Sequence, residues 1–212
     1  MSEELSYSWR GKGGGRIRVT VEPSWNQANV CRFIVEPALY PDGGAYFSKG
    51  RDADGSPLAA VLFEIADLTE VLIAGNTVTL TTETAPDWTE LSSKIAAAIR
   101  DQIDSRVPAV SDSFTSSLPG PEVVRERVQH VIDTSINPAV ASHGGVVKLL
   151  DVQGNNIFLE FGGGCQGCGM VSVTLKYGVE RLLRDQVPEV GQILDTTDHA
   201  SGQNPYYAPS AK

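Results

Sequence analysis

Two cysteines separated by two residues lie in a stretch dense in glycine, GGGCQGCGM at 162–170. Five glycines surround Cys165 and Cys168, so this loop can turn tightly and bring backbone N–H groups close to a bound group. A helix is predicted directly after Cys168, and a helix N-terminus stabilises a thiolate. Because inert core cysteines rarely occur in such loops, the pair predicts a site with two activated thiolates.

The same glycines match two phosphate-binding patterns. Gly162, Gly164 and Gly167 fit G-x-G-x-x-G, but only 45 residues follow Gly167, too few to complete a dinucleotide-binding unit. Residues 162–167 also fit G-x-x-x-x-G, but Cys168 and Gly169 stand where a P-loop needs Lys and then Ser or Thr. Both nucleotide interpretations therefore fail on their sequence context.

Three kinds of thiol chemistry remain open. A thioredoxin-like dithiol usually lies near the start of its domain beside aromatic residues or proline, whereas the neighbours here are glycines. A zinc ion needs four ligands and a [4Fe-4S] cluster usually takes four thiolates, but one chain offers this pair and only Cys31 besides. Two chains that each donate Cys165 and Cys168 around a two-fold axis would supply four.

The first half of the chain must fold around alternating apolar and polar residues. Such alternation predicts strands at 16–22 and 30–36, and a hairpin at 69–83 that turns at Gly75-Asn76. Ser56 followed by Pro57 predicts the start of a helix that ends near Ala66. A longer helix is predicted after Asp87, because apolar residues recur there at spacings of three and four.

The second half contains the elements that must position the cysteine pair. A helix is predicted from Pro121 to about Asn137, where Pro138 disturbs it, followed by two strands around Gly154-Asn155. A helix over 170–186 follows the cysteines, and 191–197 predicts a short strand.

The predicted fold class is α+β, with two small domains in which a short sheet is packed by two helices. The predicted divisions are a flexible arm at 1–15, an N-terminal domain at 16–107, a Ser- and Pro-rich linker at 108–120 and a C-terminal domain at 121–207.

Composition excludes several classes of function. The 212 residues carry a net charge of -9, which repels nucleic acid and anionic lipid, so neither nucleic acid nor a membrane is expected as a partner. The longest apolar run, 58–63, is far shorter than the roughly 18 residues of a membrane span. The acidic N-terminus has no export signal, and the close cysteine pair favours a reducing compartment. We therefore expect a cytoplasmic protein.

Several segments resemble a known family. HGGVVKLLDV at 143–152, FGGGCQGCGMVSVTLKYGVERLL at 161–183, and DTTDH followed by PYY resemble the C-terminal NifU domain of the Nfu-type iron-sulfur cluster carriers. Residues 56–82 and 87–99 resemble the N-terminal Nfu domain. The Asn-Pro-Asn stretch of that domain is replaced by Asn26-Gln27-Ala28-Asn29, which lacks the proline.

This resemblance implies a function and a site. It implies a carrier, not an enzyme, that holds a [4Fe-4S] cluster between two subunits of a homodimer and passes it to apo iron-sulfur client proteins. The cluster-assembly machinery would be a further partner. Cys165 and Cys168 match the family's ligand pair, and no other residue inherits that role. The alternative is a dithiol-disulfide oxidoreductase that uses the same two cysteines, and a zinc module shared between chains is a weaker third hypothesis.

The third cysteine, the histidines, two tyrosines and four helix arginines are expected to have structural or solvent-exposed roles. Cys31 lies in an alternating strand and is expected to be a small core residue. The three histidines have no specific claim to a site, and the tyrosines near the C-terminus are expected to lie in a disordered tail. The helix arginines are expected on solvated faces. These residues are His130, His143, His199, Tyr206, Tyr207, Arg125, Arg127, Arg181 and Arg184.

Overall fold

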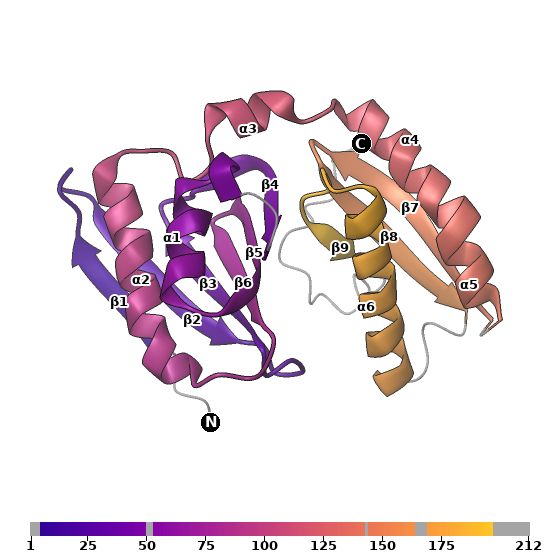
Figure 1. Ribbon diagram of the computed structural model, residues 1–212, viewed down its shortest axis with the longest axis horizontal. Coiled ribbons are helices and arrows are strands. Elements are labelled where there is room, and N and C mark those ends of the chain that lie inside the picture. The colour runs from indigo at the N-terminus through magenta and orange to yellow at the C-terminus, as the bar shows by residue number, and fades with distance from the viewer. Residues whose placement is uncertain (1–4, 50–52, 143, 164–168, 197–212) are drawn as a thin grey trace, which may run out of the picture. The chain divides into compact units, whose positions relative to one another are not determined.

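A computed structural model describes residues 5–49, 53–142, 144–163 and 169–196. The chain divides into two compact units, residues 1–118 and 119–212 (Figure 1). Each unit buries its own cluster of hydrophobic side chains and combines strands with packed helices. The predicted α+β fold class is therefore confirmed.

The first unit is built on a six-stranded antiparallel sheet with the order β1-β2-β3-β6-β5-β4. The predicted strands form as β2 (Arg16–Pro23), β3 (Val30–Glu36), β5 (Leu68–Gly75) and β6 (Thr77–Thr82). Alternation in β2 buries Val19 and Val21 on one face, as expected of a sheet covered on one side. Gly75 has φ +58° at the β5–β6 turn, where glycine adopts the left-handed conformation without a steric penalty.

Helices α1 (Pro57–Ile65) and α2 (Trp88–Ser105) cover the buried face of this sheet (Figure 1). Both begin where the sequence predicts. The Ser56 hydroxyl accepts the N–H of Ala59 at 3.0 Å, and the Asp87 carboxylate accepts the N–H of Thr89 at 2.9 Å. The apolar stripes of these helices complete the first core with Leu58, Leu62, Ile95 and Ile99.

The predicted flexible arm is wrong over Leu5–Arg10, which form strand β1. This strand pairs with β2 along its length, and the glycines at 11–15 make the connecting turn, with the Gly14 N–H donating to the Gly11 carbonyl. Tyr7 and Trp9 stack with ring centroids 5.8 Å apart, and the Arg100 guanidinium of α2 lies 5.4 Å from the Trp9 ring. Aromatic packing on α2 therefore helps to order a segment whose glycines suggested flexibility.

The predicted linker at 108–120 is also wrong over most of its length. Helix α3 (Asp112–Ser117) forms there, and Ala109 and Val110 are buried in the first core. The Phe114 ring lies 5.3 Å from that of Phe47 in strand β4 (Tyr40–Ser48), a strand that the sequence analysis missed. A Cβ on Gly55 would lie 2.6 Å from the Phe114 ring, so the absence of a side chain at Gly55 permits this packing.

The second unit places three strands against helical segments from both ends of its sequence. Strands β7 (Gly145–Gln153) and β8 (Asn156–Gly163) pair antiparallel around the predicted turn, and β9 (Ile193–Asp195) adds to β8 in parallel. Helices α4 (Pro121–Val131) and α6 (Gly169–Gln186) contribute Val124, Val128, Val179 and Leu183 to the second core. Within the described ranges, no helix is both long and apolar enough to cross a bilayer.

Pro138 does not end the first helical segment of this unit. A π-helical turn at Ile132–Ile136 follows α4, and helix α5 (Asn137–Ala141) continues to Ala141. Proline lacks an N–H and its ring clashes with the carbonyl four residues earlier, and a wider π turn relieves that clash. The helical segment therefore extends four residues beyond the end predicted at Asn137.

We expect Ser56→Ala to destabilise the first unit by about 2 kcal/mol. Besides capping α1, the Ser56 hydroxyl donates to the Ala109 carbonyl at 2.5 Å in a fully buried position. The substitution removes the cap and leaves this carbonyl without its partner. Urea unfolding followed by tryptophan fluorescence measures the loss, because all three tryptophans, Trp9, Trp25 and Trp88, lie in the first unit.

Ser93→Ala is the matched control, because Ser93 is exposed on α2 and alanine is the better helix former there. It should leave the urea midpoint unchanged or slightly raised. Equal destabilisation by the two substitutions would contradict the role assigned to Ser56.

Candidate metal centre

The cysteine pair falls between two well-packed elements. Strand β8 ends at Gly163 and helix α6 begins at Gly169, so the chain between them carries both cysteines. Residues 164–168, and with them Cys165 and Cys168, lie outside the described residues.

Strand β8 is the central strand of its sheet. It pairs with β7 on one side, with Gly163 opposite Gly145, and with β9 on the other. Alternate side chains on one face are buried: Ile157, Leu159 and Phe161 are each at most 2% exposed. The strand that leads to the cysteines is therefore held by β7 as far as Gly163, by β9 at Ile157–Leu159, and by the core beneath it.

Helix α6 is held by polar contacts near its middle and at its C-terminal end. Near its middle, Lys176 forms an ion pair with Asp195 of β9, and its ammonium lies 5.5 Å from the centre of the Phe161 ring of β8. At the C-terminal end, the Arg184 guanidinium donates to the carbonyls of Val190 and Gly191. These contacts connect helix α6 to β8 and to the chain that enters β9.

Cys31 is a core residue, as its alternating strand predicted. It is fully buried in β3 of the first unit, where burial raises the pKa of its thiol to about 12. The Arg32 charge opposes this shift only in part. A thiol that stays protonated and inaccessible is a poor ligand and a poor nucleophile.

Histidines and acids do not complete a site in the described part of the chain. No group of three or more His, Cys, Asp or Glu side chains there is placed to hold a metal ion. His130 is exposed on α4, and His143, His199, Tyr206 and Tyr207 lie outside the described residues. The cysteine pair remains the candidate that the sequence analysis proposed.

Three of the four helix arginines do more than face solvent. Arg125 pairs with Asp151 at 2.9 Å, Arg127 pairs with Glu189, and Arg184 makes the carbonyl contacts described above. Partial burial would raise the pKa of Asp151, but hydrogen bonds from Gln153, Val152 and Arg125 lower it below its usual value. Arg127 and Arg181 are exposed, as a solvated face predicts, whereas Arg125 and Arg184 are partly buried.

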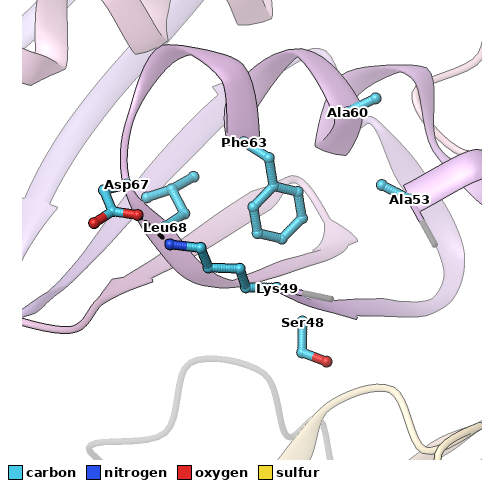
Figure 2. Close-up of a pocket in the computed structure, with 7 residues that line it drawn as sticks. All are labelled: Ser48, Lys49, Ala53, Ala60, Phe63, Asp67 and Leu68. Carbon is cyan, nitrogen blue, oxygen red and sulfur yellow. Dashed lines mark hydrogen bonds and ion pairs between the residues drawn. The ribbon is translucent and has the colours of Figure 1, made fainter. Parts of the chain in front are cut away.

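A shallow pocket in the first unit offers no comparable chemistry. Figure 2 shows the pocket beside the Lys49–Asp67 ion pair, with Phe63 and Leu68 in its wall. The hydrogen bond from Lys49 to Asp67 raises the pKa of the lysine, so the ammonium stays charged. The pocket holds about 260 Å³, and its remaining lining is Ser48, Ala53 and Ala60. None of these described lining residues carries a thiol or an imidazole.

Comparison with protein families assigns both units. The family described as "NifU-like domain" matches residues 128–194, and the family described as "Scaffold protein Nfu/NifU N terminal" matches residues 19–106. The chain is thus a two-domain protein with an Nfu N-terminal domain followed by a NifU-like domain. It belongs to the Nfu/NifU family, which confirms the resemblance drawn from its sequence.

Curated relatives match a shorter stretch of the chain than the two family matches cover together. The Fe/S biogenesis protein NfuA of Pseudomonas aeruginosa is 53% identical over 85 residues, which is 40% of this chain and 44% of the relative. The Fe/S biogenesis protein NfuA of Pseudomonas syringae pv. tomato is 50% identical over 88 residues, 40% of this chain and 45% of the relative. The chain therefore spans less than half the length of the curated relatives that it matches.

A solved structure also resembles part of the chain. The NMR structure of a NifU-like protein from Saccharomyces cerevisiae aligns with a TM-score of 0.41 at 14% identity, over 45% of this chain and 86% of that one. This score is too low to identify a fold. The fold assignment therefore rests on the strand and helix order described above.

We expect the Cys31 thiol to be unreactive in the folded protein. In a Cys165→Ser/Cys168→Ser double variant, Cys31 is the one remaining cysteine, so its reaction can be followed without interference. Reaction with Ellman's reagent at pH 8 should be at least about 1,000-fold slower than in guanidinium, because it requires opening of the core. Rapid release of one equivalent of chromophore from the folded variant would contradict the buried placement.

Proposed function

We propose that this protein binds a [4Fe-4S] cluster through Cys165 and Cys168 and passes it to apo iron-sulfur proteins. The observation that carries the proposal is the NifU-like family match over 128–194, which contains the C-x-x-C pair. The names of the curated relatives, Fe/S biogenesis protein, agree with a role in cluster assembly. The cluster is cargo in this proposal, and the protein is a carrier, not an enzyme.

The supply of ligands favours a cluster shared between two chains. A [4Fe-4S] cluster usually takes four thiolates, and this chain has three cysteines. Cys31 is buried in the other unit with a raised pKa, which leaves two per chain. Two copies related by a two-fold axis would contribute Cys165 and Cys168 twice and complete the set.

The local electrostatics favour thiolates at this position in the chain. Helix α6 is 18 residues long, and Cys168 directly precedes its first residue, Gly169. The partial positive charge of a helix N-terminus stabilises an adjacent thiolate and lowers its pKa. Deprotonated thiols are the form that binds iron, and reducing conditions such as those of the cytoplasm keep them available.

The glycines favour transfer over permanent storage. Residues without side chains flank both cysteines, so the thiolates of a recipient protein could approach and replace the ligands one at a time. A cluster shared by two chains with two ligands each is also easier to release than one enclosed by four ligands from one core. Both properties suit a carrier.

Cluster loading and dimerisation should be one event. Anaerobic reconstitution with iron, sulfide and thiol should give a brown dimer with about four iron atoms per two chains. Cys165→Ser and Cys168→Ser should each abolish loading, whereas Cys31→Ala should load like the wild type. Iron determination and native mass measurement test this expectation.

A loaded monomer, with no added thiol completing the ligands, would contradict the shared cluster. Catalytic disulfide reduction without iron, lost in the same two variants, would instead support the oxidoreductase alternative. Zinc bound at one ion per two chains in protein purified without added metal would support the third hypothesis.

Transfer should proceed directly from protein to protein. Loaded protein should activate an apo-[4Fe-4S] enzyme faster than equimolar free iron and sulfide, because the cluster is delivered already assembled. A strong iron chelator in solution should leave most of this activation intact. If the chelator stops activation completely, the cluster is shed into solution, and the carrier role fails.

A further inference from the structure

The helical segment that precedes strand β7 contains a π turn that changes the direction of the next side chain. The Asn137 N–H donates to the Ile132 carbonyl, five residues earlier, in place of the usual four. One extra residue in a turn rotates everything after it by about 100° relative to a continuous α-helix. The orientation of Asn137 therefore depends on this turn.

Asn137 uses that orientation to bind the backbone of β7. Its Oδ1 accepts the Val147 N–H at 2.8 Å, and its Nδ2 donates to the Val147 carbonyl at 3.1 Å. Among the described strands β7 is at the edge of its sheet, and Val147 is only 1% exposed, so water would satisfy these groups poorly. The side chain thus takes the place of one residue of a further strand.

The site of this contact is opposite the end of β8. Val147 pairs with Phe161, Val146 with Gly162, and Gly145 with Gly163, the last residue before the loop that carries Cys165. A Cβ on Gly162 would lie 2.9 Å from Val146 Cγ1, so the two strands approach closely here. Movement of β7 at Val147 would therefore be transmitted to the residues that lead into the cysteine loop.

We propose that Asn137 is a positioning residue for the cluster-binding loop, acting through Val147 and the paired ends of β7 and β8. This inference rests on the proposed function, because its main consequence is a longer lifetime of the bound cluster. Asn137 touches neither cysteine in this proposal. Its two hydrogen bonds fix the strand from which the loop departs.

The test compares the full-length Asn137→Ala variant with the wild type after anaerobic reconstitution. Amide exchange at Val147 should rise at least about fivefold, as expected for the loss of one hydrogen bond of ordinary strength. The half-life of the cluster absorbance in the presence of a chelator should fall by a similar factor or more. The wild type and the Asn137→Ala variant should begin with the same iron content.

Gln129→Ala is the matched control, because Gln129 lies on the same helical segment and its amide bonds to Asp133, on the exposed side of the helix. It should leave both measurements unchanged. Faster exchange at Val147 with an unchanged cluster lifetime would overturn the proposal, since the hydrogen bonds would then be structural only. If Asn137→Ala does not fold, Asn137→Asp, which keeps the acceptor and loses the donor, is judged by the same two measurements.

Failure of the proposed function is recognised separately. If the wild type does not load a cluster, the alkylation rates of Cys165 and Cys168 in the apo protein replace the cluster lifetime as the measurement. A changed rate in Asn137→Ala, with the control unchanged, would then support positioning of the loop. An unchanged rate would overturn it.

Discussion

Burial of one face of strand β8 is the constraint on which the second unit depends. Ile157, Leu159 and Phe161 fix which face of the strand is turned to the core, and a shift in register by one residue would turn them away from it. Helices α4 and α6 pack on that core through Val124, Val128, Val179 and Leu183. Apolar packing therefore holds β8 and α6, the two elements between which Cys165 and Cys168 lie in the sequence.

Elements with strong local patterns could be predicted from the sequence. Ser56 and Asp87 cap helices in the structure because their short polar side chains suit the first turn wherever the following stripe is buried. The hairpins at Gly75 and Gly154 form for a similar reason, since both glycines have positive φ. The C-x-x-C pair could be recognised from the sequence because its spacing and the surrounding glycines by themselves indicate a thiolate site. Both cysteines lie outside the described residues.

Elements that depend on distant partners could not be predicted in the same way. In β1, Leu5, Tyr7 and Trp9 alternate with polar residues, but the glycines that follow concealed the strand. In β4, Pro41 and the adjacent Asp-Gly-Gly resemble a turn, and the structure accommodates them with a register shift between Tyr40 and Gly44. Helix α3 has no apolar periodicity and is fastened chiefly by Phe114 and by backbone contacts near Gly55. The role of Asn137 was equally hidden, because nothing local to an asparagine before a proline identifies the strand that it binds.

The burial of Cys31 has a consequence for how the protein would respond to oxidants. Conversion of a cysteine to sulfenic acid and higher oxides requires both a thiolate and access for peroxide, and Cys31 in the folded chain provides neither. Damage in air would therefore be concentrated at Cys165 and Cys168, whose spacing permits an internal disulfide. A disulfide within one chain can be reduced again by a thiol reductant. Exposure to oxygen would therefore inactivate the protein reversibly, without incorrect disulfide pairing.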